Sequence, residues 1–253
     1  MGRLIHLHPD YKECEDFIRQ IPEGKYEPAK TFCNRRNTVE LVMCGGKAFV
    51  VKRYKRPTWA NCLVYTWWRK TKARRAYEYA VEMLARGFET AFPVAYIEER
   101  RWGIFHTGWF VSEYLPYPLL KDVPQMDLPE QEKLQIADDF IHYTASLHEQ
   151  GILPCDYNSG NIFFHKEGGR YRFALIDINR MQIGHTPGER QSARFFDQMG
   201  VSISQAIGAI DQYASLRGFD TDRQIFFILV HRMKKQWERS LKKHILHPLV
   251  SRK

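Results

Sequence analysis

Hydrophobic and polar positions divide the chain into a strand-rich first part and a helix-rich second part. In the first part, short runs of β-branched and aromatic residues between turn residues are typical of strands. Two of these runs flank Cys44-Gly45-Gly46-Lys47, which predicts a hairpin turn. Residues 4–20 have no clear period and are expected to be irregular or briefly helical. The strands predicted in this part lie within 31–54, at 39–43 and 48–52, and then at 94–98 and 104–114.

Helical spacing of apolar residues occurs once in the first part and repeatedly in the second. Helices are predicted over 71–86, 127–150, 189–199, 203–217 and 221–243. Gly87 is expected to end the first helix, and Asp127 with Glu130 forms a capping-box-like pair at the start of the second. His148 lies on the apolar face of that second helix, where a lone polar group is most often a hydrogen-bonded core residue. We interpret His148 as core rather than as a ligand.

The overall composition is that of an ordinary soluble globular protein. Of the 253 residues, 44% are hydrophobic and 26% are charged. The chain has no run of 18 or more uncharged apolar residues, and residues 1–10 lack the apolar core of a signal peptide. We therefore expect a cytoplasmic protein. The five cysteines are scattered and form no C-x-x-C pair, so reduced thiols and no zinc site are expected.

The net charge of +9 is concentrated in two stretches. Residues 52–75 contain nine Lys or Arg and no acid, and 232–253 contain eight Lys or Arg against Glu238. Such stretches indicate binding to a polyanion. Aromatic residues interleave with the cations of 53–68, which suits an anionic membrane surface, although they could equally be core residues beside a solvated flank.

An apolar stripe in the C-terminal basic stretch leaves two interpretations open. It repeats every fourth residue among Lys and Arg, through Trp237, Leu241, Ile245 and Leu249. Such a helix could lie in a membrane interface. The alternative is a helix that packs on the rest of the chain and exposes a basic face.

Three polar side chains after the second predicted helix have a spacing that suits chemistry on a nucleotide phosphate. Asn161 follows Asp156 by five residues, as the Asn follows the Asp in the protein-kinase catalytic loop. The Asp can accept a proton from an attacking hydroxyl, and the Asn can hold a metal ion. Strands predicted at 161–165 and 170–176 form a hairpin that places Asp177 where the metal-binding Asp of D-F-G would lie. Asp and Asn are also common in turns, so the spacing is informative only in this context.

Other candidate residues lie in the first part of the chain. Lys52 ends a predicted strand like the lysine of V-A-I-K that binds nucleotide phosphates, although a lysine there is often only a solvated charge. Glu78 and Glu82 lie one helical turn apart, and either could reach Lys52. Prolines at 116 and 118 break the strand pattern where a kinase hinge belongs. Backbone groups of residues 112–115, with Glu113 and Leu115 among the expected contacts, would then meet adenine.

Taken in order, these residues resemble the protein-kinase-like superfamily. The details resemble most the bacterial lipopolysaccharide core kinases, the family of heptose and Kdo (3-deoxy-manno-octulosonic acid) kinases. The resemblance covers roughly residues 30–185 and is carried by KARRAYEYAVEMLARG (72–87), LHEQGILPCDYNSGNIFF (147–164) and LIDINR (175–180). It implies an α+β fold of two lobes. These would be a small N-lobe at 1–114, with an antiparallel sheet and one helix, and a mostly helical C-lobe at 115–253.

The resemblance also implies a reaction and a role for each matching residue. ATP and Mg²⁺ would be the cofactors, with Lys52 holding the phosphates and Asp156 acting as the base. Asn161 and Asp177 would be the magnesium ligands. Glu78, chosen over Glu82 for its A-Y-E context, would orient Lys52. The implied acceptor is a sugar hydroxyl of nascent lipopolysaccharide (lipid A-Kdo/heptose), so the enzyme would be cytoplasmic and peripheral at the anionic inner-membrane surface.

The sequence departs from the protein-kinase pattern in several places. Pro154 and Cys155 replace the His and Arg of H-R-D, and no A-P-E follows Asp177. The loop 33–37, CNRRN, lacks the expected glycines, so Arg35 and Arg36 would contact the phosphates through side-chain charge. Two alternatives therefore stay open: a protein or small-molecule kinase of the same fold, and a non-catalytic module that binds anionic lipid. Nucleic acid is an unlikely partner because no recognised binding motif accompanies the charge.

Overall fold

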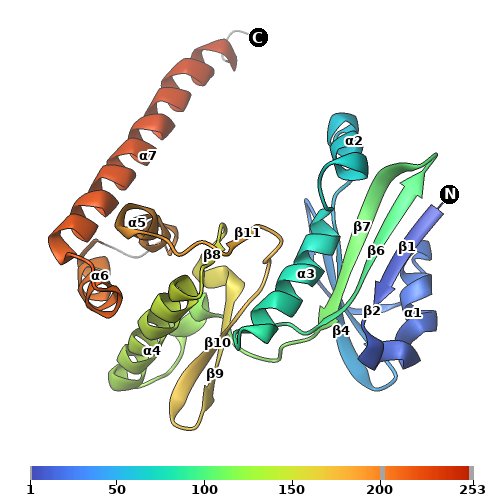
Figure 1. The fold of residues 1–253 in the computed structure, drawn as a ribbon, viewed down its shortest axis with the longest axis horizontal. Helices are drawn as coiled ribbons and strands as arrows, with labels where there is room; N and C mark the ends of the chain where they lie inside the picture. The colour runs from blue at the N-terminus through green and yellow to red at the C-terminus, as the bar shows by residue number, and fades with distance from the viewer. Residues whose placement is uncertain (1, 200–202, 251–253) are drawn as a thin grey trace. The chain divides into compact units, whose positions relative to one another are not determined.

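The chain folds into two compact units. The computed structural model describes residues 2–199 and 203–250, and the side chains in these ranges except those of 197, 203–205 and 242–250. The first unit comprises the described residues of Met1–Pro118 and Ala174–Met181, and the second those of Leu119–Phe173 and Gln182–Lys253 (Figure 1). The predicted division at 114/115 differs in two respects: the boundary lies after Pro118, and 174–181 belongs to the first unit rather than to the second.

A six-stranded antiparallel sheet forms the centre of the first unit, in the order β1-β6-β7-β4-β3-β2. The predicted strands and the hairpin turn in this unit are confirmed. The expectation for 4–20 was wrong at its start, because β1 is held by pairing with β6, with Ile5 opposite Ile97, and its own sequence has no clear period. The strands are β1 (Gly2–Leu7), β2 (Pro28–Asn34), β3 (Thr38–Cys44), β4 (Lys47–Arg53), β6 (Pro93–Arg101) and β7 (Ile104–Glu113).

The two faces of this sheet bury different sets of side chains, because successive strand residues point to opposite sides. One face packs Phe49 and Val51 of β4 against Ile18 of α1 (Glu15–Gln20). On the other face, Tyr54 and Tyr96 pack against α3 (Lys72–Ala85). Figure 1 shows α1 and α3 on opposite sides of the sheet. The remaining helical segments before β2 are the 3-10 turns η1 (Pro9–Cys14) and η2 (Ile21–Glu23).

Both ends of α3 are specified locally. Thr71 is its N-cap and accepts the N–H of Arg74 on its side-chain oxygen at 3.2 Å. Gly87 follows the helix with φ of 79°, a left-handed conformation that glycine adopts without strain. The prediction for this helix is thus confirmed. The short helix α2 (Trp59–Trp67) precedes it and exposes Trp59 and its two C-terminal tryptophans, so these rings are not core.

The segment 174–181 is fixed to the first unit by a parallel pair. The short strand β5 (Glu89–Thr90) follows α3 and pairs with the end of β10 (Arg170–Leu175), with Thr90 opposite Leu175. The side-chain hydroxyl of Thr90 also donates to the Leu175 carbonyl at 2.6 Å. These bonds determine where the chain after Leu175 begins, and Asp177 lies two residues further on.

The second unit is largely helical around a β hairpin. The predicted hairpin is confirmed by β9 (Ile162–Glu167) and the start of β10, with Gly168 and Gly169 at positive φ in the turn. The predicted capping box was wrong: α4 begins at Glu130, after an N-cap Pro129 that makes no side-chain cap bond. The other elements are η3 (Leu120–Gln125), α4 (Glu130–Glu149), β8 (Ile152–Pro154), η4 (Ser159–Asn161), β11 (Met181–Ile183), α5 (Glu189–Gln198), α6 (Ile203–Arg217) and α7 (Thr221–Val250).

The structure confirms the prediction that His148 is a core residue. Its side chain is buried, and Nδ1 lies 2.7 Å from the hydroxyl of Tyr213 on α6. Arg217 donates to the same hydroxyl at 2.8 Å, so the Tyr213 hydroxyl donates to a neutral imidazole. Burial, with a smaller contribution from the Arg217 charge, lowers the pKa of His148 to about 3. In the described ranges, the helices are all too short or too polar to cross a bilayer.

Candidate active site

Lys52 and Asp177 form an ion pair inside the first unit. Lys52 is the sixth residue of β4, and its Nζ lies 2.7 Å from Oδ1 of Asp177. Both side chains are partly shielded, at 15% and 34% exposure. The same ammonium lies 5.5 Å from the ring centroid of Tyr54, a favourable cation–π distance. Burial and the Asp177 carboxylate raise the pKa of Tyr54, so this phenol stays protonated.

Asp177 has a backbone conformation that few non-glycine residues adopt. Its φ is 56°, in the left-handed region. Such a conformation persists when the surroundings impose it, and it is enriched at functional sites. Here the pairing of β10 with β5 precedes Asp177, and buried Asn179 donates from Nδ2 to Oδ1 of the same carboxylate. The Asp177 carboxylate is thereby held toward Lys52.

Asp156 and Asn161 lie together in the loop that follows β8 in the second unit. Nδ2 of Asn161 donates to the backbone carbonyl of Asp156 at 3.0 Å, and the backbone N–H of Asn158 donates to the same oxygen at 3.1 Å. Tyr157 anchors the loop from inside: its buried hydroxyl lies 2.7 Å from that of Thr144. The loop thus keeps the exposed Asp156 and the amide of Asn161 in a fixed arrangement.

The expected partner of Lys52 on α3 is corrected by the structure. Glu78 accepts from Lys70 at 2.8 Å and from Arg74 at 2.9 Å, and it forms no bond with Lys52. Despite the opposing effect of burial, these two cations lower the pKa of the Glu78 carboxyl. Glu82 instead pairs with Arg86. Both glutamates lie on the side of α3 that carries their i,i±4 basic neighbours, which a helical period alone could not reveal.

The residues of the first unit that were predicted to contact the nucleotide differ in whether they are already hydrogen-bonded within the protein. Arg35 and Arg36 lie exposed between β2 and β3, whereas residues 33 and 34 of the predicted loop belong to β2. The Glu113 carboxylate is already engaged, because it accepts from the hydroxyl of Tyr11. The backbone N–H groups of 113 and 114 donate to Phe92 and Ala48, at 2.9 and 3.0 Å. Among the described residues, Leu115 is the member of this predicted group whose backbone makes no such bond.

The sequence pattern did not predict the position of two cations that α3 adds beside Tyr54. Lys72 is half-buried, and Arg75, one turn later, is 9% exposed. The pKa of Lys72 is lowered by burial first and then by the charges of Arg36, Arg180 and Arg75, while Asp177 opposes the shift. The sequence shows the nine cations of 52–75 and the absence of acids among them. It does not show which way the side chains of the helical cations point.

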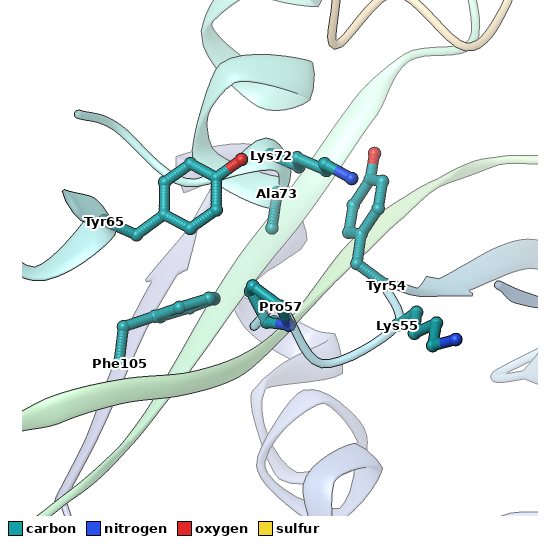
Figure 2. Close-up of a pocket in the computed structure, with 8 residues that line it drawn as sticks. Tyr54, Lys55, Pro57, Tyr65, Lys72, Ala73 and Phe105 are labelled. Atoms are coloured by element: carbon teal, nitrogen blue, oxygen red, sulfur yellow. The ribbon is translucent and has the colours of Figure 1, made fainter. Parts of the chain in front are cut away.

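Lys72 also borders a small hollow beside Tyr54. Figure 2 shows the Lys72 amine directed toward the Tyr54 ring, with Pro57, Tyr65 and Phe105 on the other sides. The hollow encloses about 10 Å³, roughly the space that one water needs. The hollow is therefore too small for a nucleotide. It shows, however, that the Lys72 amine lies beside Tyr54.

Comparisons with known proteins give a short sequence match and an extensive structural one. No protein-family profile matches the chain. A stretch of 75 residues, 29% of the chain, is 32% identical to the probable serine/threonine-protein kinase fnkB of Dictyostelium discoideum. The match spans only 14% of that relative's length. The solved structure of WaaP in complex with acyl carrier protein is similar over 91% of this chain and 98% of that one, with a TM-score of 0.64 and 14% identity.

These likenesses agree with the architecture of the two units. An antiparallel sheet with α3 on one face, followed by a mostly helical unit, is the arrangement that the predicted α+β kinase-like fold required. The similarity to WaaP extends over nearly the whole length of both chains. The chain therefore has a protein-kinase-like fold, similar to that of WaaP, and the prediction of fold class is confirmed.

Proposed function

We propose that this chain, which has a protein-kinase-like fold, is an ATP-dependent kinase. It transfers the γ-phosphoryl group of ATP to a sugar hydroxyl, of Kdo or heptose, in the inner core of nascent lipopolysaccharide. The Lys52–Asp177 ion pair is the observation that carries the proposal. In a kinase, a strand lysine binds the nucleotide phosphates and the aspartate after the hairpin binds the metal, and here these two side chains are in direct contact. The sequence resemblance to the lipopolysaccharide core kinases supplies the acceptor.

In the proposed reaction each side chain has a separate task. Asp156 accepts the proton of the attacking hydroxyl, and its exposed carboxylate suits a group that must meet a large acceptor. Lys52 holds the nucleotide phosphates and neutralises the charge that develops during transfer. Asp177 holds the Lys52 ammonium in place before the nucleotide binds. Because phosphoryl transfer depends on positioning and electrostatics, these fixed charges are the main contribution of the protein.

Magnesium suits the oxygen donors that the chain offers. Asn161 uses Nδ2 to bond Asp156, which leaves its carbonyl oxygen for a cation, and Asp177 keeps Oδ2 when Oδ1 accepts from Lys52. Mg²⁺ typically takes one or two protein oxygens and completes its shell with phosphates and water. It therefore does not need a metal-binding group of three His, Cys, Asp or Glu side chains, and none is present among the described residues. Bound Mg²⁺ would neutralise charge on the transferred phosphoryl group.

Exposed tryptophans support a peripheral position on an anionic membrane. The α2 surface, as we call it, comprises four tryptophans that are at least 63% exposed, Trp59, Trp67, Trp68 and Trp102. Trp102 lies in the β6–β7 turn, and Thr66 of α2 accepts the N–H of Phe105 beside that turn at 3.0 Å. Indole rings with a polar edge favour the headgroup region. The nine cations of 52–75 would add electrostatic attraction to anionic lipid.

The helix α7 adds a second candidate membrane contact within its own unit. Its exposed apolar side chains recur at helical spacing, at Phe226, Val230, Met233, Trp237 and Leu241. The side chains of Ile245 and Leu249, which continue the predicted stripe, lie outside the described residues, as do Arg252 and Lys253. For Trp237 and Leu241, 65% and 37% exposed, the structure favours a solvent-facing stripe over packing against the chain. An amphipathic basic helix of this kind suits an anionic interface.

A protein partner is a second candidate, which one observation favours. The solved structure of WaaP is a complex with acyl carrier protein. A similar small protein could bind this chain and cover part of its exposed apolar surface. Purification of the tagged chain from its host, followed by mass spectrometry of stoichiometric partners, tests this possibility.

The proposed activity is tested in vitro and in cells. Purified protein with Mg²⁺ and γ-labelled ATP should label inner-core lipopolysaccharide, and the Asp156→Asn variant should not. Mass spectrometry of core lipopolysaccharide from cells with and without the chain should show a loss of phosphate on Kdo or heptose. If neither labelling nor a change of phosphate content occurs, while the Asp156→Asn variant binds anionic vesicles like the wild type, the non-catalytic lipid-binding alternative replaces the kinase proposal.

A further inference from the structure

A group of cations in the first unit is centred on Lys72 and, among the described residues, forms no ion pair with an acid. Lys72 and Arg75 occupy one side of the first turn of α3, and Arg36 comes from the connection between β2 and β3. Lys72 reaches toward the Tyr54 ring (Figure 2), and Lys52 lies 5.5 Å from the centre of the same ring. The α3 cations and the Lys52–Asp177 pair thus gather around Tyr54.

The neighbouring arginines Arg74 and Arg75 have opposite environments. Arg74 donates to Glu78 at 2.9 Å and is 43% exposed. Arg75 is buried, and its Nε reaches only the Thr71 carbonyl, at 3.4 Å. Within the described part of the chain, no carboxylate forms an ion pair with Arg75, Lys72 or Arg36. Burying a cation without a counter-charge is unfavourable, so Arg75 has a cost that a bound anion would remove.

Electrostatic repulsion within the group agrees with this geometry. Burial, and then the charge of Arg69, lowers the pKa of Arg75, and the lowered pKa of Lys72 has Arg36, Arg180 and Arg75 among its causes. Asp177 is the acid that opposes the shift at Lys72, but its Oδ1 already accepts from Lys52. The Asp177 carboxylate therefore cannot neutralise both Lys52 and Lys72, and the surroundings of Lys72 keep an excess of positive charge.

We propose that Arg36, Lys72 and Arg75 form a binding site for a phosphate-type anion, which supplies the negative charge that α3 does not provide. The two guanidinium groups suit bidentate contact with phosphate oxygens, and the Lys72 ammonium adds a compact charge. The site gives a role to the face of α3 that was expected to carry an acid toward Lys52. It also compensates for the glycine-free loop, because side-chain cations replace backbone amides.

The phosphate chemistry has two possible sources, the polyphosphate tail of the nucleotide and a phosphate group on the acceptor. The proximity of Lys72 to Tyr54 and thus to Lys52 favours the nucleotide tail. To that extent the inference rests on the proposed function. The site itself requires only an anion, so binding of inorganic tripolyphosphate tests it without phosphoryl transfer.

The experiment is isothermal titration calorimetry on the full chain and on matched variants. The ligands are inorganic tripolyphosphate, ATP, adenosine and glucose 6-phosphate, the last as a sugar phosphate. Arg75→Gln and Lys72→Gln should each weaken tripolyphosphate binding by roughly 10- to 100-fold, the range expected for losing a charged hydrogen bond. Arg74→Gln, next to Arg75 but already paired, should weaken it less than about 3-fold. Adenosine affinity should not change in these variants.

The comparison of ligands separates the two sources. A loss confined to tripolyphosphate and ATP assigns the site to the nucleotide tail, whereas a parallel loss for glucose 6-phosphate assigns it to a phosphate on the acceptor. Equal tripolyphosphate affinity in wild type, Arg75→Gln and Lys72→Gln would overturn the proposal. Because Arg75 is buried, the melting temperature of the Arg75→Gln protein is compared with that of the Lys72→Gln protein. Lys72 is half-buried, so the fold should persist in its variant. Failure of the kinase proposal would appear as absent transfer with this binding intact.

Discussion

Lys52 donates to Asp177 across 2.7 Å, although 125 positions separate the two residues in the sequence. The bond connects a strand of the six-stranded sheet to a segment that returns from the other unit and pairs with β5. Lys52 was predicted to bind the phosphates of ATP, and Asp177 was predicted to bind the magnesium ion. Their direct contact provides a fixed pair of opposite charges, which the nucleotide and its cation would rearrange on binding.

Lys52 and Asp177 are expected to act as one unit. Lys52→Met and Asp177→Asn should each lower kcat/KM by at least about 100-fold, because each removes charge stabilisation from the transition state. The double variant should be little worse than either single variant, since effects of residues that act together are not additive. Steady-state kinetics of the four proteins measures this coupling. If the loss of kcat/KM in the double variant equals the product of the two single losses, the two side chains act independently.

Glu78 is expected to matter little for catalysis. Its partners are Lys70 and Arg74, so Glu78→Gln should change kcat/KM by less than about 3-fold and destabilise the fold by about 0.5 kcal/mol, as partly exposed ion pairs usually do. Glu82→Gln, which removes the pair with Arg86, is the matched control. Activity and thermal unfolding of both variants test this. A loss of 100-fold or more in Glu78→Gln would indicate that this glutamate reaches Lys52 during turnover.

Asp156 and Asn161 are expected to give different kinetic signatures although they share a loop. Asp156→Asn removes the general base, so kcat should fall by roughly 10²- to 10⁴-fold while the Kd for ATP is unchanged. Asn161→Ala removes a magnesium ligand, so the Mg²⁺ concentration for half-maximal activity should rise. Titrations of ATP and of Mg²⁺ distinguish the two. An unchanged Mg²⁺ requirement in Asn161→Ala would remove this residue from the metal site.

His148 is expected to make the fold sensitive to acid. Its folded pKa of about 3 lies below the ordinary value of 6.5, so the unfolded chain binds more protons between these values and stability rises with pH across that window. From pH 6.5 to 5 the loss should be about 2 kcal/mol. Urea unfolding at several pH values should show a smaller slope for His148→Gln than for wild type.

The α2 surface is expected to bind anionic vesicles. Removing Trp67 and Trp68 together should reduce sedimentation with phosphatidylglycerol vesicles by about 10-fold or more, since each buried indole contributes over 1 kcal/mol. Met43→Ala, an exposed apolar position on β3, is the control and should bind like wild type. Phosphatidylcholine vesicles and high salt should both weaken binding. Equal binding of the double variant would assign membrane attachment to another surface, with α7 the next to test.

The sequence by itself determined the local features of this protein. Helical and alternating periods identified α3, the hairpin of β3 and β4 and that of β9 and β10, because each depends on neighbours within a few residues. The spacing of Asp156, Asn161 and Asp177 likewise identified the candidate chemistry, since motif spacing is a property of the chain. His148 could be interpreted as core from its place in an apolar stripe.

The tertiary structure alone decided which distant groups meet. The pairing of β1 with β6 and of β10 with β5 joins segments that are far apart in the sequence, and no local period encodes such partners. The side of α3 that faces Asp177 depends on how Ala73 and Tyr77 pack on the sheet. That packing turned Glu78 toward Lys70 and Arg74, and it left Lys72 and Arg75 beside Tyr54. A helical period fixes the angles between side chains but not their common direction, which packing sets.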